Sequence, residues 1–213
     1  KNLDQTIVEI ITDAYKKHGR IIFNGNGYSE EWKEEAKRRG LTNETSANTA
    51  LRKYLDPEIL KVTEETGMLT IQESASRYNA YAERYITHLC IEARTLIDMA
   101  NKYILPFGLK YSNLLAENIE RIEKFYPEGA EEQKELLKSV LTDISNIRKE
   151  TKLLEARIAE VKKEENLEKQ TDMAKEFLVE GLENLRVPCD NLEKIVDNEI
   201  WTLPTYTDLL FKL

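Results

Sequence analysis

The sequence predicts an all-α fold, an up-and-down helical bundle with long antiparallel coiled-coil-like helices and a docked apolar C-terminal tail. Apolar positions recur at alternating steps of four and three residues, the spacing of a coiled-coil seam. The first run is Val140, Ile144, Ile147, Thr151, Leu154, Ile158 and Val161. The second run is Leu167, Thr171, Ala174, Leu178, Gly181 and Leu185. Because neither helix can bury its apolar face alone, each must pack on another helix.

Composition supports the same fold class. Hydrophobic residues make up 41% of the 213 residues and charged residues 33%, which is typical of elongated helices with broad solvated faces. Strand content should be minimal. We expect two segments: residues 1–69, with short helices and an Asn-Gly turn, and residues 70–213, with the helical bundle and the tail.

The first helix is expected over residues 3–18, where Gly19 is placed to end it. Its apolar stripe contains Leu3, Ile7, Ile11 and Ala14. The run Asn24-Gly25-Asn26-Gly27 follows a short β-prone stretch and indicates a tight turn, because Asn-Gly steps tolerate positive φ. Ser29 is then an N-cap for a helix that reaches Arg39 and stops at Gly40.

Residues 42–49 are polar and are predicted to form a loop. Asp56-Pro57 is a start signal for a short helix that ends by Gly67, with Asp as N-cap and Pro in the first turn. Thr70 and Glu73 have the spacing of a capping box, so a long helix should begin there. This helix is expected to reach Ile104 and to be ended by Pro106.

Three further helices are expected over residues 109–125, 131–164 and 167–185. Short connections between them favour antiparallel packing. Val187-Pro188 should break the last of these helices, with a short helix following through Ile195. The tail from Trp201 to Leu213 is rich in aromatic and aliphatic residues, so it must dock, either on its own bundle or on a neighbouring subunit.

Charge and cysteine content exclude several classes of protein. A formal net charge of −8 disfavours nucleic-acid binding, which depends on Lys and Arg for phosphate neutralisation. No apolar run is long enough to span a membrane, and the first residues lack the apolar core of a signal peptide. We therefore expect a soluble, cytoplasmic chain with no membrane partner. Cys90 and Cys189 are far apart in the sequence and should be reduced core thiols.

No catalytic, cofactor-binding or metal-binding residue is predicted in this chain. Neither His18 nor His88 has a Glu three residues before it, so the Glu-x-x-His pairs of a di-iron bundle are absent. The Asn24 to Gly27 turn lacks the Gly-Lys-Ser/Thr ending of a P-loop. No Gly-x-Ser-x-Gly nucleophile motif occurs.

Several short motifs carry a resemblance to a known family. The stretch from Arg20 to Trp32, together with Glu35-Ala36 and Arg39-Gly40-Leu41, resembles the segment just beyond the catalytic core of type III glutamine synthetases. Further similar segments are Ser76-Arg77-Tyr78, residues 91–100, Ile104-Leu105-Pro106 and the tail from Trp201 to Tyr206 with Leu209-Leu210-Phe211. They follow the order of the family and span nearly the whole chain.

The resemblance implies a parent enzyme that joins ammonia to glutamate through a γ-glutamyl phosphate, using ATP and Mg or Mn, and that assembles into large ring-shaped homo-oligomers. The catalytic residues of the family lie in the preceding core, so none is carried over to this chain. The first 69 residues would adjoin that core.

The leading hypothesis is therefore a non-catalytic helical C-terminal domain that serves subunit assembly or braces the ring, with its own catalytic core and neighbouring subunits as partners. A second hypothesis is a free-standing coiled-coil adaptor. A third is a regulatory module that senses glutamine or a nucleotide.

Overall fold

The computed structural model describes residues 2–204 and 206–211. Contacts within the chain divide it between Ser46 and Ala47 into two compact units. The described residues form helices and connecting segments without any strand, which confirms the all-α prediction. The predicted boundary between residues 69 and 70 concerns contact with a catalytic core, and it stays a prediction.

The first unit consists of α1 (Leu3–His18), a 3₁₀ turn (Gly19–Ile21) and α2 (Glu30–Arg38). The predicted N-cap of α2 is confirmed, because the Ser29 hydroxyl accepts a hydrogen bond from the Trp32 amide. Gly40 ends this segment with a left-handed φ of 72°, a conformation that favours glycine.

The Asn-Gly turn forms for a different reason from the predicted one. Neither Gly25 nor Gly27 has left-handed backbone. Instead, the Asn26 side chain accepts a hydrogen bond from the Tyr28 amide at 3.0 Å, and the Asn26 carbonyl accepts another from the Ser29 amide at 3.0 Å. Asn26 therefore holds the turn through its own side chain, as asparagine often does.

The second unit begins with the short helices α3 (Ala47–Arg52) and α4 (Pro57–Glu65), joined by a 3₁₀ turn (Lys53–Leu55). Asp56 caps α4 as predicted, accepting from the Glu58 amide at 3.0 Å. The loop predicted over residues 42–49 is wrong for its last residues, which lie in α3. Asn48 is buried there and donates to Asp172 of another helix, a tertiary contact that the local sequence does not reveal.

The long helix runs without interruption through α5 (Ile71–Met99), a π turn (Ala100–Ile104) and α6 (Leu105–Phe125), a length of 55 residues. Its start confirms the predicted capping box of Thr70 and Glu73. The prediction that Pro106 ends the helix is wrong. The Leu105 amide bonds to the Ala100 carbonyl, five residues earlier, and this wide turn just before Pro106 accommodates a ring that would clash in a regular helix.

The chain returns through α7 (Glu131–Lys163) and then through α8 (Leu167–Met173), a second π turn (Ala174–Val179) and α9 (Glu180–Ile195). The predicted break at Val187-Pro188 is also wrong, because Pro188 lies inside α9 and is buried. Its ring is packed in the core, so tertiary burial offsets the lost helical hydrogen bond.

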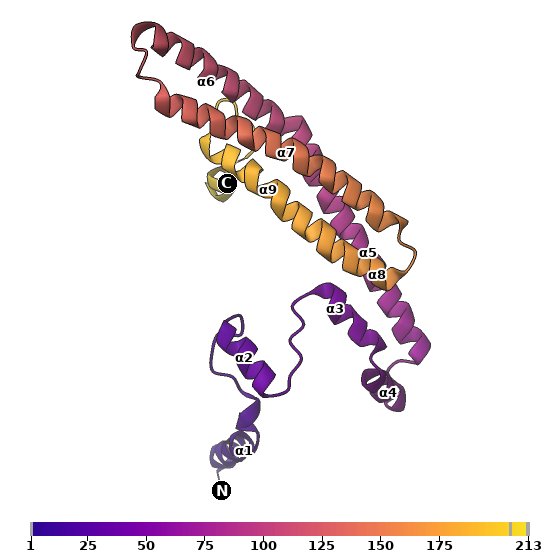
Figure 1. Ribbon diagram of the computed structural model, residues 1–213. Coiled ribbons are helices and arrows are strands. Elements are labelled where there is room, and N and C mark those ends of the chain that lie inside the picture. The colour runs from indigo at the N-terminus through magenta and orange to yellow at the C-terminus, as the bar shows by residue number, and fades with distance from the viewer. Residues whose placement is uncertain (1, 205, 212–213) are drawn as a thin grey trace. The chain divides into compact units, whose positions relative to one another are not determined.

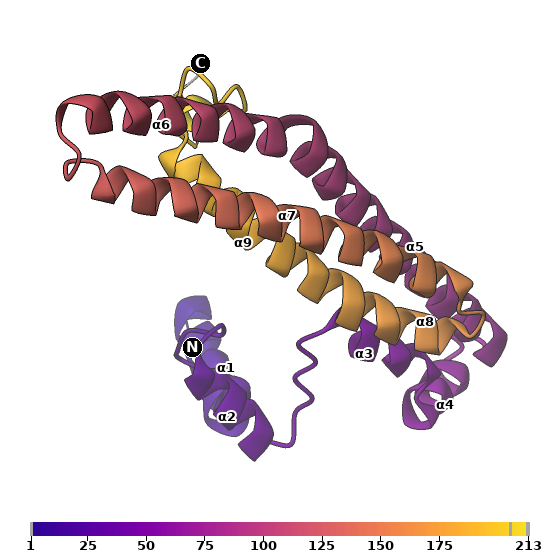
Figure 2. The same cartoon turned by 45° about the horizontal axis from the view of Figure 1, so that its top comes forward.

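Both predicted seams lie in the core of the second unit. All residues of the first run are buried on α7, and in the second run all are buried except Leu167, which is partly covered. Figures 1 and 2 show α7 running beside α9 and the long α5–α6 helix. Gly181 lets α9 approach closely, because a Cβ there would lie 2.7 Å from Leu154 Cδ1.

The first residues of the tail pack on their own bundle. Trp201 is 7% exposed, and its ring centroid lies 5.3 Å from that of Phe107 on α6. The short helix α10 (Tyr206–Phe211) follows. The predicted docking is wrong for Leu209 and Leu210 of this helix, which are 67% and 73% exposed. For Thr205, Lys212 and Leu213 the prediction lies outside the described residues.

Candidate interaction surfaces

Chemistry-bearing side chains do not converge in the described part of the chain. No group of three or more His, Cys, Asp or Glu residues there could hold a metal ion. His18 and His88 are both exposed, on α1 and α5. Burial raises the pKa of the Cys189 thiol to about 12 and also raises that of Cys90, so neither is an activated nucleophile. The prediction of no site residue stays a prediction.

No described helix is both long enough and apolar enough to cross a membrane.

The glycine-rich turn has a local structural explanation. A Cβ on Gly25 would lie 2.6 Å from the Phe23 ring, and that ring packs on Trp32 with centroids 4.9 Å apart. Glycine at this position therefore allows the Phe23 ring to close over the turn. This accounts for the sequence Asn24 to Gly27 without a bound ligand.

The first candidate surface is the apolar face of α1. None of the residues of this helix is buried, although the helix has the amphipathic pattern of a packed one. The exposed apolar side chains on α1 and the turn after it are Leu3, Ile7, Val8, Ile10, Ile11, Tyr15, Ile21 and Ile22. A run of this size on consecutive turns is typical of a binding surface rather than of scattered exposure.

An ion-pair cluster stabilises the first unit behind that surface. The Arg39 guanidinium donates to the carbonyls of Arg20 at 2.8 Å and Ile22 at 3.4 Å, so it ties the end of α2 to the segment after α1. Glu35 orients Arg39 and also pairs with Arg38. Hydrogen bonds from Arg38, then Arg39, lower the pKa of Glu35 to about 2, so this carboxylate is ionised at neutral pH.

A second polar cluster fixes α3 on the bundle. Arg52 pairs with Asp172 and Glu168 of α8, and Asn48 donates to Asp172 at 2.8 Å. Burial raises the pKa of Asp172, but hydrogen bonds from Arg52 and Asn48 outweigh it, so the pKa lies below its usual value. Sequence reasoning missed this cluster because its members are more than a hundred residues apart.

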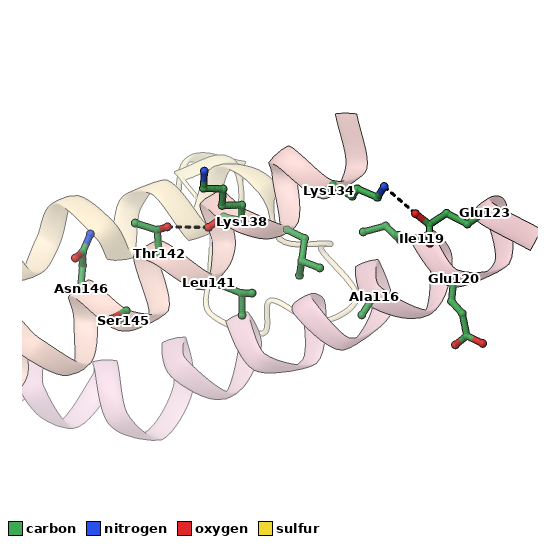
Figure 3. Close-up of a pocket in the computed structure, with 11 residues that line it drawn as sticks. Ala116, Ile119, Glu120, Glu123, Lys134, Lys138, Leu141, Thr142, Ser145 and Asn146 are labelled. Atoms are coloured by element: carbon green, nitrogen blue, oxygen red, sulfur yellow. Dashed lines mark hydrogen bonds and ion pairs between the residues drawn. The ribbon is translucent and has the colours of Figure 1, made fainter. Parts of the chain in front are cut away.

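The second candidate surface is a groove of about 680 Å³ between α6 and α7, near the loop that joins them (Figure 3). Ile119, Leu137 and Leu141 give it an apolar floor. An ion pair between Glu123 of α6 and Lys134 of α7, at 2.7 Å, crosses one end. Leu137 continues the heptad seam of α7 three residues before Val140, whereas Leu141 lies off it. An apolar residue beside the seam, Leu141, was the sequence signal that could have revealed the groove.

Comparison with known proteins decides the family. The family model described as "Glutamine synthetase C-terminal domain" matches residues 6–123, more than half of the chain. The chain belongs to the glutamine synthetase C-terminal domain family. The resemblance of the sequence to type III glutamine synthetases is thereby confirmed at the level of this domain.

Curated relatives of this glutamine synthetase C-terminal domain extend the similarity over nearly the whole chain. "Glutamine synthetase" of Bacteroides fragilis (strain YCH46) is 35% identical over 98% of this chain and 29% of its own length. "Type-3 glutamine synthetase" of Dictyostelium discoideum is 29% identical over 95% of this chain and 28% of its own length. "Glutamine synthetase" of Butyrivibrio fibrisolvens is 27% identical over 99% of this chain and 30% of its own length. The chain thus spans less than a third of each relative.

The matched family model covers both candidate surfaces only in part. It includes nearly all of α1 and the α6 wall of the groove, but it ends before α7 begins. The relatives, in contrast, align along α7 and α9 as well. The glutamine synthetase C-terminal domain in this chain therefore consists of more than the segment that defines the family model, because the buried faces of α5 and α6 are covered by α7 and α9.

Proposed function

We propose that this chain is the non-catalytic C-terminal part of a longer glutamine synthetase, which ligates ammonia to glutamate with ATP and a divalent metal such as Mg or Mn. The proposal is supported by relatives that are about three times longer than their match to this chain. ATP and metal would bind in the preceding part of the polypeptide. The role of this chain is to attach to that part and to brace neighbouring subunits of a homo-oligomer.

The observation that carries the proposal is the uncovered face of α1. This helix has only 16 residues, and an isolated helix of that length is marginal in water. Transfer of a single Ile side chain from water to an apolar environment stabilises by roughly 1.5–3 kcal/mol. Burial of Ile7, Ile10 and Ile11 together therefore stabilises the helix in its docked form. A surface on the preceding catalytic part of the same polypeptide covers α1 and buries these side chains.

The position of α1 in the chain supports this choice of cover. The family model is described as a C-terminal domain and begins at residue 6, so the remaining length of the relatives belongs mainly before α1. A helix that follows a large domain directly is held near it by the chain itself, which raises the effective concentration for docking. An unrelated partner would lack this advantage, and this disfavours the free-standing adaptor.

The test uses the full-length polypeptide that contains this chain. Ile7→Ser with Ile11→Ser should release α1, and we expect both loss of the high-mass assembly in light scattering and a reduced rate of ATP- and ammonia-dependent glutamine formation. Ile91→Ser is the matched control, since Ile91 is an exposed isoleucine of α5, which belongs to the second unit. It should change neither quantity.

Two results would contradict the proposal. A full-length polypeptide that forms no glutamine in the presence of ATP, Mg²⁺ or Mn²⁺, ammonia and glutamate would remove the assigned reaction. An α1 double variant with unchanged mass and activity would remove the assigned attachment. The 213-residue chain alone should show no turnover.

A further inference from the structure

The groove between α6 and α7 lies where the bundle thins to a pair of helices. Both views show the ends of α6 and α7 nearest their connecting loop extending beyond α9 (Figures 1 and 2). α9 packs closely on α6 at Gly108, where a Cβ would lie 3.1 Å from Leu192 of α9 and 3.0 Å from Ile144 of α7. The groove lies closer to the loop, and its lining comes from residues 116–123 of α6 and residues 134–146 of α7.

This half of the hairpin leaves apolar side chains partly uncovered beside the core seam. Leu137 is half-buried and Leu141 is 48% exposed, and both line the groove with Ile119 of α6. One turn further along α7 the lining becomes Ser145 and Asn146. The apolar part of the lining therefore lies at the end of the groove nearest the loop.

The two walls of the groove carry opposite charges. The ionisable residues that line it on α6 are Glu120 and Glu123, and those on α7 are Lys134 and Lys138. Glu123 and Lys134 are in contact, so they lie at the same level along the hairpin. One turn away from the loop, Glu120 on α6 is level with Lys138 on α7, because the helices run in opposite directions. Glu120 forms an exposed ion pair with Lys124 of its own helix at 2.7 Å, an i,i+4 contact of a kind that contributes little. Lys138 has no ion pair with any residue that the structure describes.

We propose that the occupant of this groove is the same groove of a second copy of this chain, which completes an antiparallel four-helix bundle. The charge pattern selects the symmetry. A two-fold axis parallel to the helices places α6 of each copy over α7 of the other at the same level, so Glu120 meets the partner copy's lysine at position 138. An axis across the helices would place α6 on α6 and oppose like charges. The inference names the partner surface for the proposed role in subunit assembly and rests on that role.

The interface should be weak in isolation and effective in an assembly. The groove spans only about two helical turns of α6, so the buried area is at the low end for protein interfaces. Copies held in one homo-oligomer would meet at a high effective concentration, which strengthens association without new contacts.

A mixed disulfide tests the geometry directly. Ala116 lies seven residues before Glu123, and Leu141 lies seven residues after Lys134, so these two groove residues are also level with each other. One preparation of the chain carries Ala116→Cys and another carries Leu141→Cys, which allows a disulfide between these positions only in trans. The native Cys90 and Cys189 are buried. We expect a disulfide-linked dimer on oxidation of the mixture and none from Ala116→Cys alone.

Cross-linking of Ala116→Cys with itself would overturn the proposed axis. Absence of the mixed disulfide at millimolar chain concentration would overturn the proposed occupant. The same pair is then introduced into the full-length polypeptide. A cross-link that forms in the chain but not in the full-length protein would mean that another part of the protein covers the groove, and this too would contradict the inference.

Charge exchange tests the recognition. In sedimentation equilibrium, Glu120→Lys and Lys138→Glu should each weaken dimer formation about tenfold, and the double variant should restore it, because both ion pairs are then rebuilt with reversed sign. Leu141→Ser should abolish the dimer. Leu114→Ser is its matched control, since Leu114 is 49% exposed on α6 but does not line the groove. Single charge variants that associate as the parent does would contradict the proposal.

Failure of this inference is distinguishable from failure of the proposed function. The groove variants leave the α1 face unchanged, and the α1 variants leave the groove unchanged. An enzyme whose assembly depends on Ile7 and Ile11 but not on Glu120 or Lys138 would retain the proposed function and lose this interface.

Discussion

Single side chains fix the peripheral elements of this domain, and Asp172 is the clearest case. It accepts hydrogen bonds from both Arg52 and Asn48 of α3, so Asp172→Asn should loosen α3. Because Asp172 is half exposed, solvent screening limits the loss to about 1 kcal/mol. The expected result is faster hydrogen exchange in residues 47–55. Asp98→Asn is the control, since it removes only an exposed pair with Lys102, and it should leave α3 unchanged.

Acid should release the same contact. The pKa of Asp172 is lowered in the folded chain, so its stabilisation is fully present above the ordinary pKa of an aspartate, about 3.9. It is lost as the pH falls through the lowered folded-state value. The side-chain amide resonances of Asn48 in NMR spectra should therefore stay unchanged from neutral pH to about pH 4 and shift only below it. A shift that begins near neutrality would contradict the assigned contact.

At the scale of elements, the sequence predicted helix starts and buried faces better than helix ends. Ser29, Asp56 and Thr70 cap helices as expected, because a cap is a contact within a few residues. Pro106 and Pro188 do not end helices. Their tolerance depends on a π turn and on burial against other helices, and neither is encoded by spacing along the chain.

The π turn before Pro106 can be tested by removing its extra residue. Deletion of Asn101, which is exposed, should convert the turn to regular α-helix without rotating the buried faces on either side. Pro106 would then stand in a regular helix and cost about 3 kcal/mol. The double change of this deletion with Pro106→Ala should recover most of that loss, measured by urea unfolding. Equal stability of the two deletion variants would show that the π turn has another cause.

The candidate surfaces were only partly predictable from the sequence. The sequence predicted the apolar stripe of α1 as one face of a helix. Only the structure shows that no residue of this helix is buried. The groove was not predicted, because Leu137 continues the heptad seam of α7 and Leu141 is a single apolar residue beside it. The Arg39 and Arg52 clusters were missed for a related reason: Arg39 bonds to distant backbone carbonyls, and Arg52 bonds to side chains far along the chain.

At the scale of the whole chain, the two units differ greatly in how much they bury. Ala36 is the only buried residue among residues 2–46, whereas the core of the second unit contains many large aliphatic side chains. Stability of a compact unit comes mainly from buried apolar surface. The first unit, tested without its proposed cover, should therefore unfold at a lower denaturant concentration than the second.

The two tryptophans allow this to be measured, because Trp32 lies in the first unit and Trp201 in the second. In the 213-residue chain, Trp201→Phe leaves fluorescence that reports on the first unit, and Trp32→Phe leaves fluorescence that reports on the second. We expect a shallow transition at low urea from the first variant and a steep transition at higher urea from the second, since the slope scales with the surface exposed on unfolding. Far-ultraviolet circular dichroism on both variants controls for effects of the substitutions. Coincident transitions would mean that the chain unfolds as one cooperative body.

In the full-length polypeptide, docking of α1 should move the Trp32 transition to higher urea, because an interaction made only by the folded state stabilises it.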